Sequence, residues 1–251
     1  MISKSEIKKI RSLNTKKGRE LCNLILIEGK RLVNQVMHSE FNINKIWTTD
    51  DFYNKNKGLI KQLNDTVVDL ISVQDLKKIT KTQTPSGIIG IMDRPLGDIK
   101  KMNQRIIILD NIADPGNLGS ILRTANWFGI NNVVLSEDCV DPYNSKVIRS
   151  AMGSHFSMNI VKTNIVKYIN RLYMDNFQII AADLDTKHTI KKLKLESNKW
   201  ALLMGSEAHG LSESVSNLVD YKIKIPQSGQ IESLNVSVAC GIFLYHMSVM
   251  K

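Results

Sequence analysis

Five short runs rich in isoleucine, valine and leucine recur beyond residue 104 of this 251-residue chain, at residues 105–109, 132–135, 178–182, 200–204 and 222–225. Nearly continuous apolar runs are typical of strands that are covered on both faces of a parallel sheet. Helix-like segments separate the runs, at residues 119–128, 145–152, 165–175 and 234–250. The pattern predicts an α/β domain over residues 105–251.

The first part of the chain, residues 1–92, predicts a smaller α/β domain. Its expected strands are residues 24–27, 45–49, 67–71 and 87–92, and its expected helices are residues 5–13, 30–38 and 74–81. Residues 93–104 are polar, include Pro95 and Gly97, and lack apolar periodicity. We interpret this stretch as a linker between the two domains.

Three polar segments of the second domain each lie at the end of a predicted strand: residues 110–125, 203–211 and 225–238. Ligands of open α/β sheets bind beyond the carboxyl ends of the strands. In the first segment Arg123 lies off the apolar face of the expected helix, where its fork of donors can hold a phosphate or orient a ribose. The segments are therefore candidates for a polar ligand site.

Each segment alone also has an ordinary structural explanation. The first can be a strand-to-helix loop with a solvated arginine. In the second, Ser206 or Glu207 can cap a short helix, and in the third Ser233 and Asn235 can cap the last helix. His209 can be an exposed loop residue. No single segment decides between these explanations and a functional one.

Composition narrows the function classes. A formal charge of +10 favours an anionic partner, with nucleic acid as the first candidate. The three cysteines and five histidines have neither disulfide nor metal-ligand spacing, so we expect no metal. A P-loop, a dinucleotide-binding glycine motif and a hydrolase nucleophile elbow are all missing. Without a signal peptide or an apolar run of membrane-spanning length, we expect a soluble, cytoplasmic protein.

Together the polar segments closely resemble the three motifs of the SpoU (TrmH-like) RNA ribose methyltransferases, a family of the SPOUT superfamily. The matching residues are Asn117 to Thr124, then Met204 to Glu207 with Gly210 and Leu211, then Ile225 and Pro226 with Ser233 to Ser237. They occur in the family's order and cover the second domain. The first domain resembles, more weakly, the small substrate-binding domain that many members carry, through its length, its basicity and Leu26 to Gly29.

The resemblance implies a SPOUT-type parallel sheet with a C-terminal trefoil knot, and a homodimer with its sites near the subunit interface. It implies methyl transfer from S-adenosyl-L-methionine to a ribose 2′-hydroxyl of structured RNA. Asn117, Arg123, Glu207, Ser233 and Asn235 would form the catalytic site. The cofactor would be bound by Gly205, Ile225 and Leu234, largely through backbone atoms.

The family account often makes the first-motif arginine the base, but a guanidinium is effectively always protonated. We therefore expect Arg123 to orient the ribose and stabilise the developing alkoxide, while the proton leaves to water, phosphate or Glu207. The sequence leaves these three acceptors open.

The separate first domain favours 23S ribosomal RNA as the substrate, with transfer RNA as the alternative. A non-catalytic RNA-binding protein of ribosome assembly is a further alternative, although every motif residue is present. The expected phosphate contacts are basic residues near the start of the chain, which position RNA without reading its sequence: Lys8, Lys9, Arg11, Lys16, Lys17 and Arg19. A solvated helix face would explain these residues equally simply.

Overall fold

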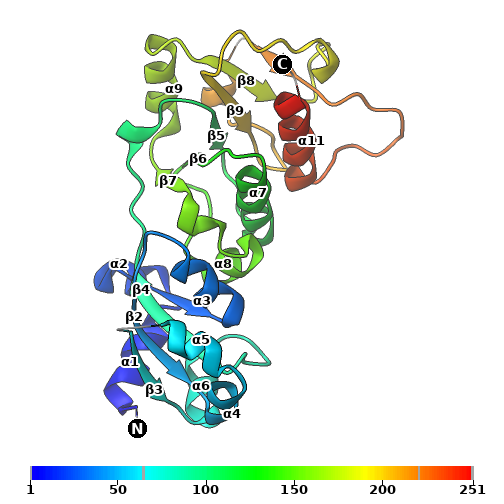
Figure 1. Cartoon of the computed structure of the whole chain (residues 1–251). Coiled ribbons are helices and arrows are strands. Elements are labelled where there is room, and N and C mark those ends of the chain that lie inside the picture. The colour runs from blue at the N-terminus through cyan, green and yellow to red at the C-terminus, as the bar shows by residue number, and fades with distance from the viewer. Residues whose placement is uncertain (1, 64–65, 220, 250–251) are drawn as a thin grey trace. The chain divides into compact units, whose positions relative to one another are not determined.

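The computed structural model describes residues 2–63, 66–219 and 221–249 (Figure 1). The chain forms two compact units: Met1–Pro95 with Tyr143–Phe156, and Leu96–Pro142 with Ser157–Lys251. Residues 143–156 thus belong to the first unit, although the sequence pattern grouped them with the second domain. The reason is apolar packing, because Tyr143, Ile148 and Phe156 join the buried cluster of the first sheet.

The first unit is built on a four-stranded mixed sheet in the order β1-β4-β2-β3. Its strands are β1 (Leu24–Glu28), β2 (Ile43–Thr48), β3 (Val67–Leu70) and β4 (Ile88–Asp93). β4 pairs antiparallel with β1 and with β2, whereas β2 and β3 are parallel. The helices are α1 (Lys4–Ser12), α2 (Lys16–Cys22), α3 (Lys30–Met37), α4 (Asp50–Lys55), α5 (Lys57–Gln62), α6 (Val73–Ile79) and α8 (Ser145–Ala151).

The second unit is built on a six-stranded sheet in the order β10-β8-β9-β5-β6-β7, in which all pairings are parallel. Its strands are β5 (Ile106–Leu109), β6 (Asn132–Leu135), β7 (Asn159–Lys162), β8 (Gln178–Ala182), β9 (Trp200–Met204) and β10 (Lys222–Ile223). The helices are α7 (Pro115–Trp127), α9 (Ile165–Met174), α10 (Glu213–Ser216) and α11 (Val236–Val249). The predicted parallel sheet is confirmed.

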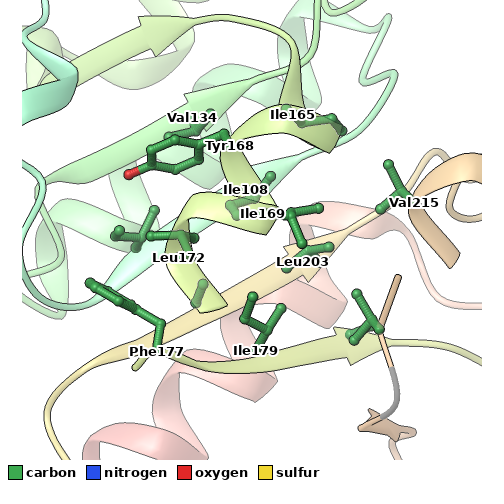
Figure 2. Packing of buried hydrophobic residues seen from close by; sticks show 14 of the residues in the cluster. Ile108, Val134, Ile165, Tyr168, Ile169, Leu172, Phe177, Ile179, Leu203 and Val215 are labelled. Carbon is green, nitrogen blue, oxygen red and sulfur yellow. The ribbon is translucent and has the colours of Figure 1, made fainter. Parts of the chain in front are cut away.

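One buried apolar cluster of the second unit lies between α9 and one face of this sheet (Figure 2). Ile165, Ile169 and Leu172 of α9 pack with Ile108 of β5 and Leu203 of β9, and all five are buried. α7 and α11 pack against each other (Figure 1). None of the helices among the described residues combines the length and apolar character needed to cross a membrane.

β5 is the point at which the strand order changes direction. The chain passes from β5 to β6 and β7 on one side, and then crosses to β8 and β9 on the other. β5 therefore has β6 and β9 as its neighbours, and the loops after β5 and β9 begin side by side. Such switch points are where open α/β sheets bind ligands.

Of the stretch expected to be a linker, Asp93 ends β4, whereas residues 96–104 belong to the second unit. Gly97 and Asp98 pack there against β7. The backbone amide of Asp98 donates to Asn159 Oδ1 at 2.7 Å, and Asn159 Nδ2 donates to the Asp98 carbonyl at 2.9 Å. Gly97 lies so close to β7 that a Cβ atom would be 2.2 Å from the carbonyl oxygen of Ile160. A glycine is required here because the neighbouring atom belongs to backbone and cannot easily move.

We predict that Gly97→Ala lowers the free energy of unfolding by about 1–3 kcal/mol, because the added methyl group overpacks a close backbone contact. Gly229→Ala is the matched control in the same unit, since a Cβ atom there would meet nothing within 4 Å. Urea unfolding followed by circular dichroism measures both variants. Equal stability of the two would contradict the close packing of this stretch on β7.

Candidate functional site

The loops that follow β8, β9 and β10 enclose a cavity of about 640 Å³, a volume usual for small-molecule sites. Its apolar wall includes Met204, Ile223, Val236, Ala239 and Phe243. The rest of the lining comes from residues 182–185, 205–211, 216, 224–229 and 231–234. The cavity therefore lies beyond the carboxyl ends of the strands, where the sequence predicted a ligand site.

The three residues expected to bind the cofactor, Gly205, Ile225 and Leu234, all line this cavity. Gly205 begins a tight loop, in which Ser206 and Gly210 exchange two backbone hydrogen bonds of 2.9 Å. A Cβ atom on Gly205 would lie 2.1 Å from the carbonyl carbon of Gly210. Only glycine permits this closure, which leaves Glu207, Ala208 and His209 at the tip of the loop.

Glu207 joins the three motifs through hydrogen bonds to its carboxylate. Asn117 Nδ2 donates to Oε2 at 3.1 Å, and Asn235 Nδ2 donates to Oε1 at 2.5 Å. The backbone amide of Val236, the first residue of α11, also donates to Oε1 at 3.0 Å. Asn235 Nδ2 further donates to Asn117 Oδ1 at 2.9 Å. The structure thus places Asn117, Glu207 and Asn235 in one network.

Capping interactions are present as well and do not compete with this network. Asp114 caps α7 by accepting from the amide of Asn117 at 2.8 Å. Asn235 Oδ1 accepts from the amide of Ser237 at 3.0 Å, so this side chain caps α11 while its Nδ2 contacts the other motifs. In the third segment, the helix cap and the contacts with the other motifs are therefore compatible.

Asp110 is a site residue to which the sequence assigned no role. It directly follows β5 and is buried. Its amide donates to the Met204 carbonyl at 2.9 Å, and its Oδ2 accepts from the Ser212 amide at 2.7 Å. Both ends of the loop that carries Glu207 are thereby attached to the end of β5. Its position directly after a buried strand is the sequence feature that could have identified Asp110.

Two expected catalytic residues stand apart from the network. Ser233 lines the cavity but makes no hydrogen bond with any residue in the described part of the chain. Arg123 is exposed on α7, outside the cavity lining, and its guanidinium makes no hydrogen bond or ion pair with a described residue. Its donors are free to meet a ligand from solution.

Among the predicted phosphate contacts, Lys8, Lys9, Arg11, Lys16 and Lys17 are exposed in the first unit. Arg19 differs, because it is only 3% exposed and its Nη1 donates to the Leu13 carbonyl at 2.7 Å. A buried guanidinium that binds backbone cannot also contact RNA, so Arg19 is removed from the candidate set.

The cysteines do not take part in the site. Cys139 and Cys240 are buried, and Cys22 is partly exposed. Burial raises the pKa of the Cys240 thiol to about 12, which keeps it protonated at neutral pH. A thiolate nucleophile in α11 is therefore excluded.

Comparisons with known proteins show which family the chain resembles. Residues 104–245 match the model of the SpoU rRNA Methylase family, and residues 4–90 match the MRM3-like substrate binding domain. The chain is 30% identical to the Bacillus subtilis 23S rRNA (guanosine(2553)-2'-O)-methyltransferase RlmP, over 96% of this chain and 95% of that protein. It is 29% identical to the mouse mitochondrial rRNA methyltransferase 3, over 90% and 68% of the two chains.

Among solved structures, the AdoMet-bound rRNA methyltransferase from Sinorhizobium meliloti superimposes with a TM-score of 0.87 at 25% identity, covering 98% of this chain and 95% of that one. The family match spans the second unit and all three motifs, including the network around Glu207. The chain belongs to the SpoU family of rRNA methylases.

Proposed function

We propose that this protein transfers the methyl group of S-adenosyl-L-methionine to a ribose 2′-hydroxyl of ribosomal RNA. The observation that carries the proposal is the network of Asn117, Glu207 and Asn235 beside a 640 Å³ cavity lined by Gly205, Ile225 and Leu234. Family membership and the names of the relatives support the reaction class.

The residues around the cavity fit S-adenosyl-L-methionine. Apolar side chains such as Ile223, Leu234 and Phe243 suit a flat adenine ring, and the loop backbone offers N–H and C=O groups to its polar edge. Gly205 and Gly229 keep side chains out of this space. When bound, the cofactor supplies an electrophilic methyl group on a positively charged sulfur.

Glu207 serves mainly to hold the site together. Its carboxylate accepts three hydrogen bonds within the protein. A carboxylate has about four acceptor positions, so little capacity remains for a proton from the substrate. We assign the departing proton to water or to a neighbouring phosphate of the RNA. One N–H of the Asn117 amide is left for the acceptor ribose, since its other N–H is used by Glu207.

Arg123 meets the RNA from α7. Its exposed guanidinium is a permanent cation with donors that suit phosphate and ribose oxygens. In this role it orients the ribose and stabilises negative charge that develops on the 2′ oxygen. Arg123 therefore does not need to act as the base that removes the proton of the 2′-hydroxyl.

The proposed substrate is 23S ribosomal RNA, and the name of the Bacillus subtilis relative supports it. Transfer RNA remains the alternative target. Mapping ribose methylation in a strain that lacks the gene tests this choice: loss of one 2′-O-methyl group from 23S RNA is expected, and loss from a transfer RNA instead would overturn it. The reaction would take place in the cytoplasm, where Lys8, Lys9, Arg11, Lys16 and Lys17 of the first unit are proposed phosphate contacts.

A homodimer and a C-terminal trefoil knot are also part of the proposal, as the resemblance to the SPOUT superfamily implies. Support for the homodimer comes from α11, where Val238, Ile242, Tyr245 and Val249 form one exposed stripe. These residues are spaced by three or four positions, so they share one helix face. We propose that a second copy of the chain covers this stripe.

Arg123→Ala is expected to reduce turnover by about 10²–10³-fold, because a charge that stabilises the transition state is lost. Binding of S-adenosyl-L-methionine, measured by calorimetry, is expected to stay unchanged, since Arg123 lies outside the cavity. Arg171→Ala on α9 is the control, as Arg171 pairs with Asp175, the C-cap residue of the same helix, at 3.5 Å. Full methyl transfer by the Arg123 variant would contradict its assignment.

Asn235→Asp places a second carboxylate beside Glu207 in place of an N–H donor. We expect at least about a tenfold loss of cofactor affinity. Repulsion between the two carboxylates and the lost hydrogen bond each destabilise the network beside the cavity by about 1–3 kcal/mol. Asn164→Asp is the control, since Asn164 caps α9 through its side-chain oxygen and aspartate caps equally well. Unchanged affinity in the first variant would show that the network does not shape the cavity.

Ile242→Asp is expected to convert the dimer to a monomer, because a buried unpaired charge opposes association. Light scattering after size-exclusion chromatography measures the mass. Met174→Asp on α9, an exposed apolar residue away from the stripe, is expected to leave the mass unchanged. A dimeric Ile242 variant would place the interface elsewhere.

A further inference from the structure

A second hollow, of about 560 Å³, lies on the surface of the first unit between α3 and α5. It is lined by Lys30, Arg31 and Asn34 of α3 and by Gly58, Leu59 and Gln62 of α5. None of these residues was among the predicted contacts, and none belongs to the cavity of the second unit. The charges and polar groups of the hollow indicate which kind of ligand it can bind.

The two helices that line the hollow carry four positively charged side chains. α3 contributes Lys30 and Arg31, α5 contributes Lys57 and Lys61, and neither helix contains an acidic residue. None of the four makes an ion pair or side-chain hydrogen bond within the described part of the chain. Lys55 of α4, in contrast, is paired with Asp51 at 2.9 Å. An anion is therefore the complementary ligand.

Stability of the fold does not account for this charge. Lys30 and Arg31 occupy the first two positions of α3, where the helix dipole disfavours positive side chains. Lys78 near the end of α6, in contrast, pairs with Asp75 at 2.7 Å. Two uncompensated cations at an unfavourable position indicate a role in binding.

The lining favours a sugar–phosphate backbone over a base. It contains no aromatic side chain on which a base could stack, whereas the exposed amides of Asn34 and Gln62 can bond ribose and phosphate oxygens. Gly58 keeps the floor open, since a Cβ atom there would meet nothing within 4 Å. Two adjacent cations and two amides along an open hollow suit an extended polyanion.

We propose that the hollow between α3 and α5 binds the phosphate backbone of the RNA substrate, with Lys30 and Arg31 as its main contacts. This inference rests on the proposed function, in which the substrate is RNA, and it names a surface distinct from the basic residues of α1 and α2.

The test compares two double variants of the full chain that each remove two positive charges from the first unit. Lys30→Gln/Arg31→Gln empties the hollow of its main cations, and Lys55→Gln/Lys78→Gln removes two lysines that are paired on their own helices. An unmodified transcript of 23S ribosomal RNA is the probe, in filter-binding measurements at several salt concentrations. Calorimetry with S-adenosyl-L-methionine reports whether the second unit is intact.

The hollow variant is expected to bind the transcript at least about tenfold more weakly. The slope of its log affinity against log salt concentration is expected to be less steep by about 1–2. The control is expected to change affinity less than about threefold, because paired surface charges contribute little. Asn34→Asp, which adds a carboxylate to the hollow, is expected to weaken binding in the same direction.

Wild-type affinity and salt slope in the hollow variant, or equal losses in both double variants, would overturn this assignment and leave the proposed function standing. A wild-type protein that binds S-adenosyl-L-methionine but retains no ribosomal transcript would overturn the proposed ribosomal substrate, and this inference with it.

Discussion

The parallel pairing of β5 with β9 is the interaction on which the site depends. It places Asp110 at the end of β5 beside Met204 at the end of β9, where a backbone hydrogen bond of 2.9 Å joins them. The Asp110 carboxylate also accepts a hydrogen bond of 2.7 Å from the amide of Ser212, at the far end of the loop that follows β9. With both ends of its loop fixed, Glu207 can accept from Asn117 and Asn235, which come from two other segments of the chain. With this pairing in place, residues of the other two motifs meet at the carboxylate of Glu207.

In the proposed function, the two units divide the work between chemistry and recognition. The second unit supplies an apolar cavity with a polar network at its edge, a combination that suits a small cofactor next to a polar acceptor. The first unit supplies exposed cations on α1, α2, α3 and α5. In the proposed function, phosphate contacts of the first unit would position the RNA without reading its bases.

Much of the second unit could be predicted, because its strands are buried on both faces and therefore read as apolar runs. The observed bounds of β6, β8 and β9 are the predicted ones. β7 was missed because it is an edge strand with only Ile160 buried, and α4 and α5 were missed because short polar helices have no marked periodicity. The placement of residues 143–156 depends on tertiary packing of Ile148 and Phe156, which no local pattern reveals.

The site itself was predictable as a set of residue types but not as a geometry. Sequence motifs named Asn117, Glu207 and Asn235, whereas their shared hydrogen bonds follow from strand order. Burial of Arg19 against the Leu13 carbonyl was equally invisible in a run of basic residues. The most direct measurement is transfer of a labelled methyl group from S-adenosyl-L-methionine to 23S ribosomal RNA, followed by digestion to nucleosides. The label is expected in a single 2′-O-methylnucleoside, and label in a methylated base, or none in RNA, would contradict the account.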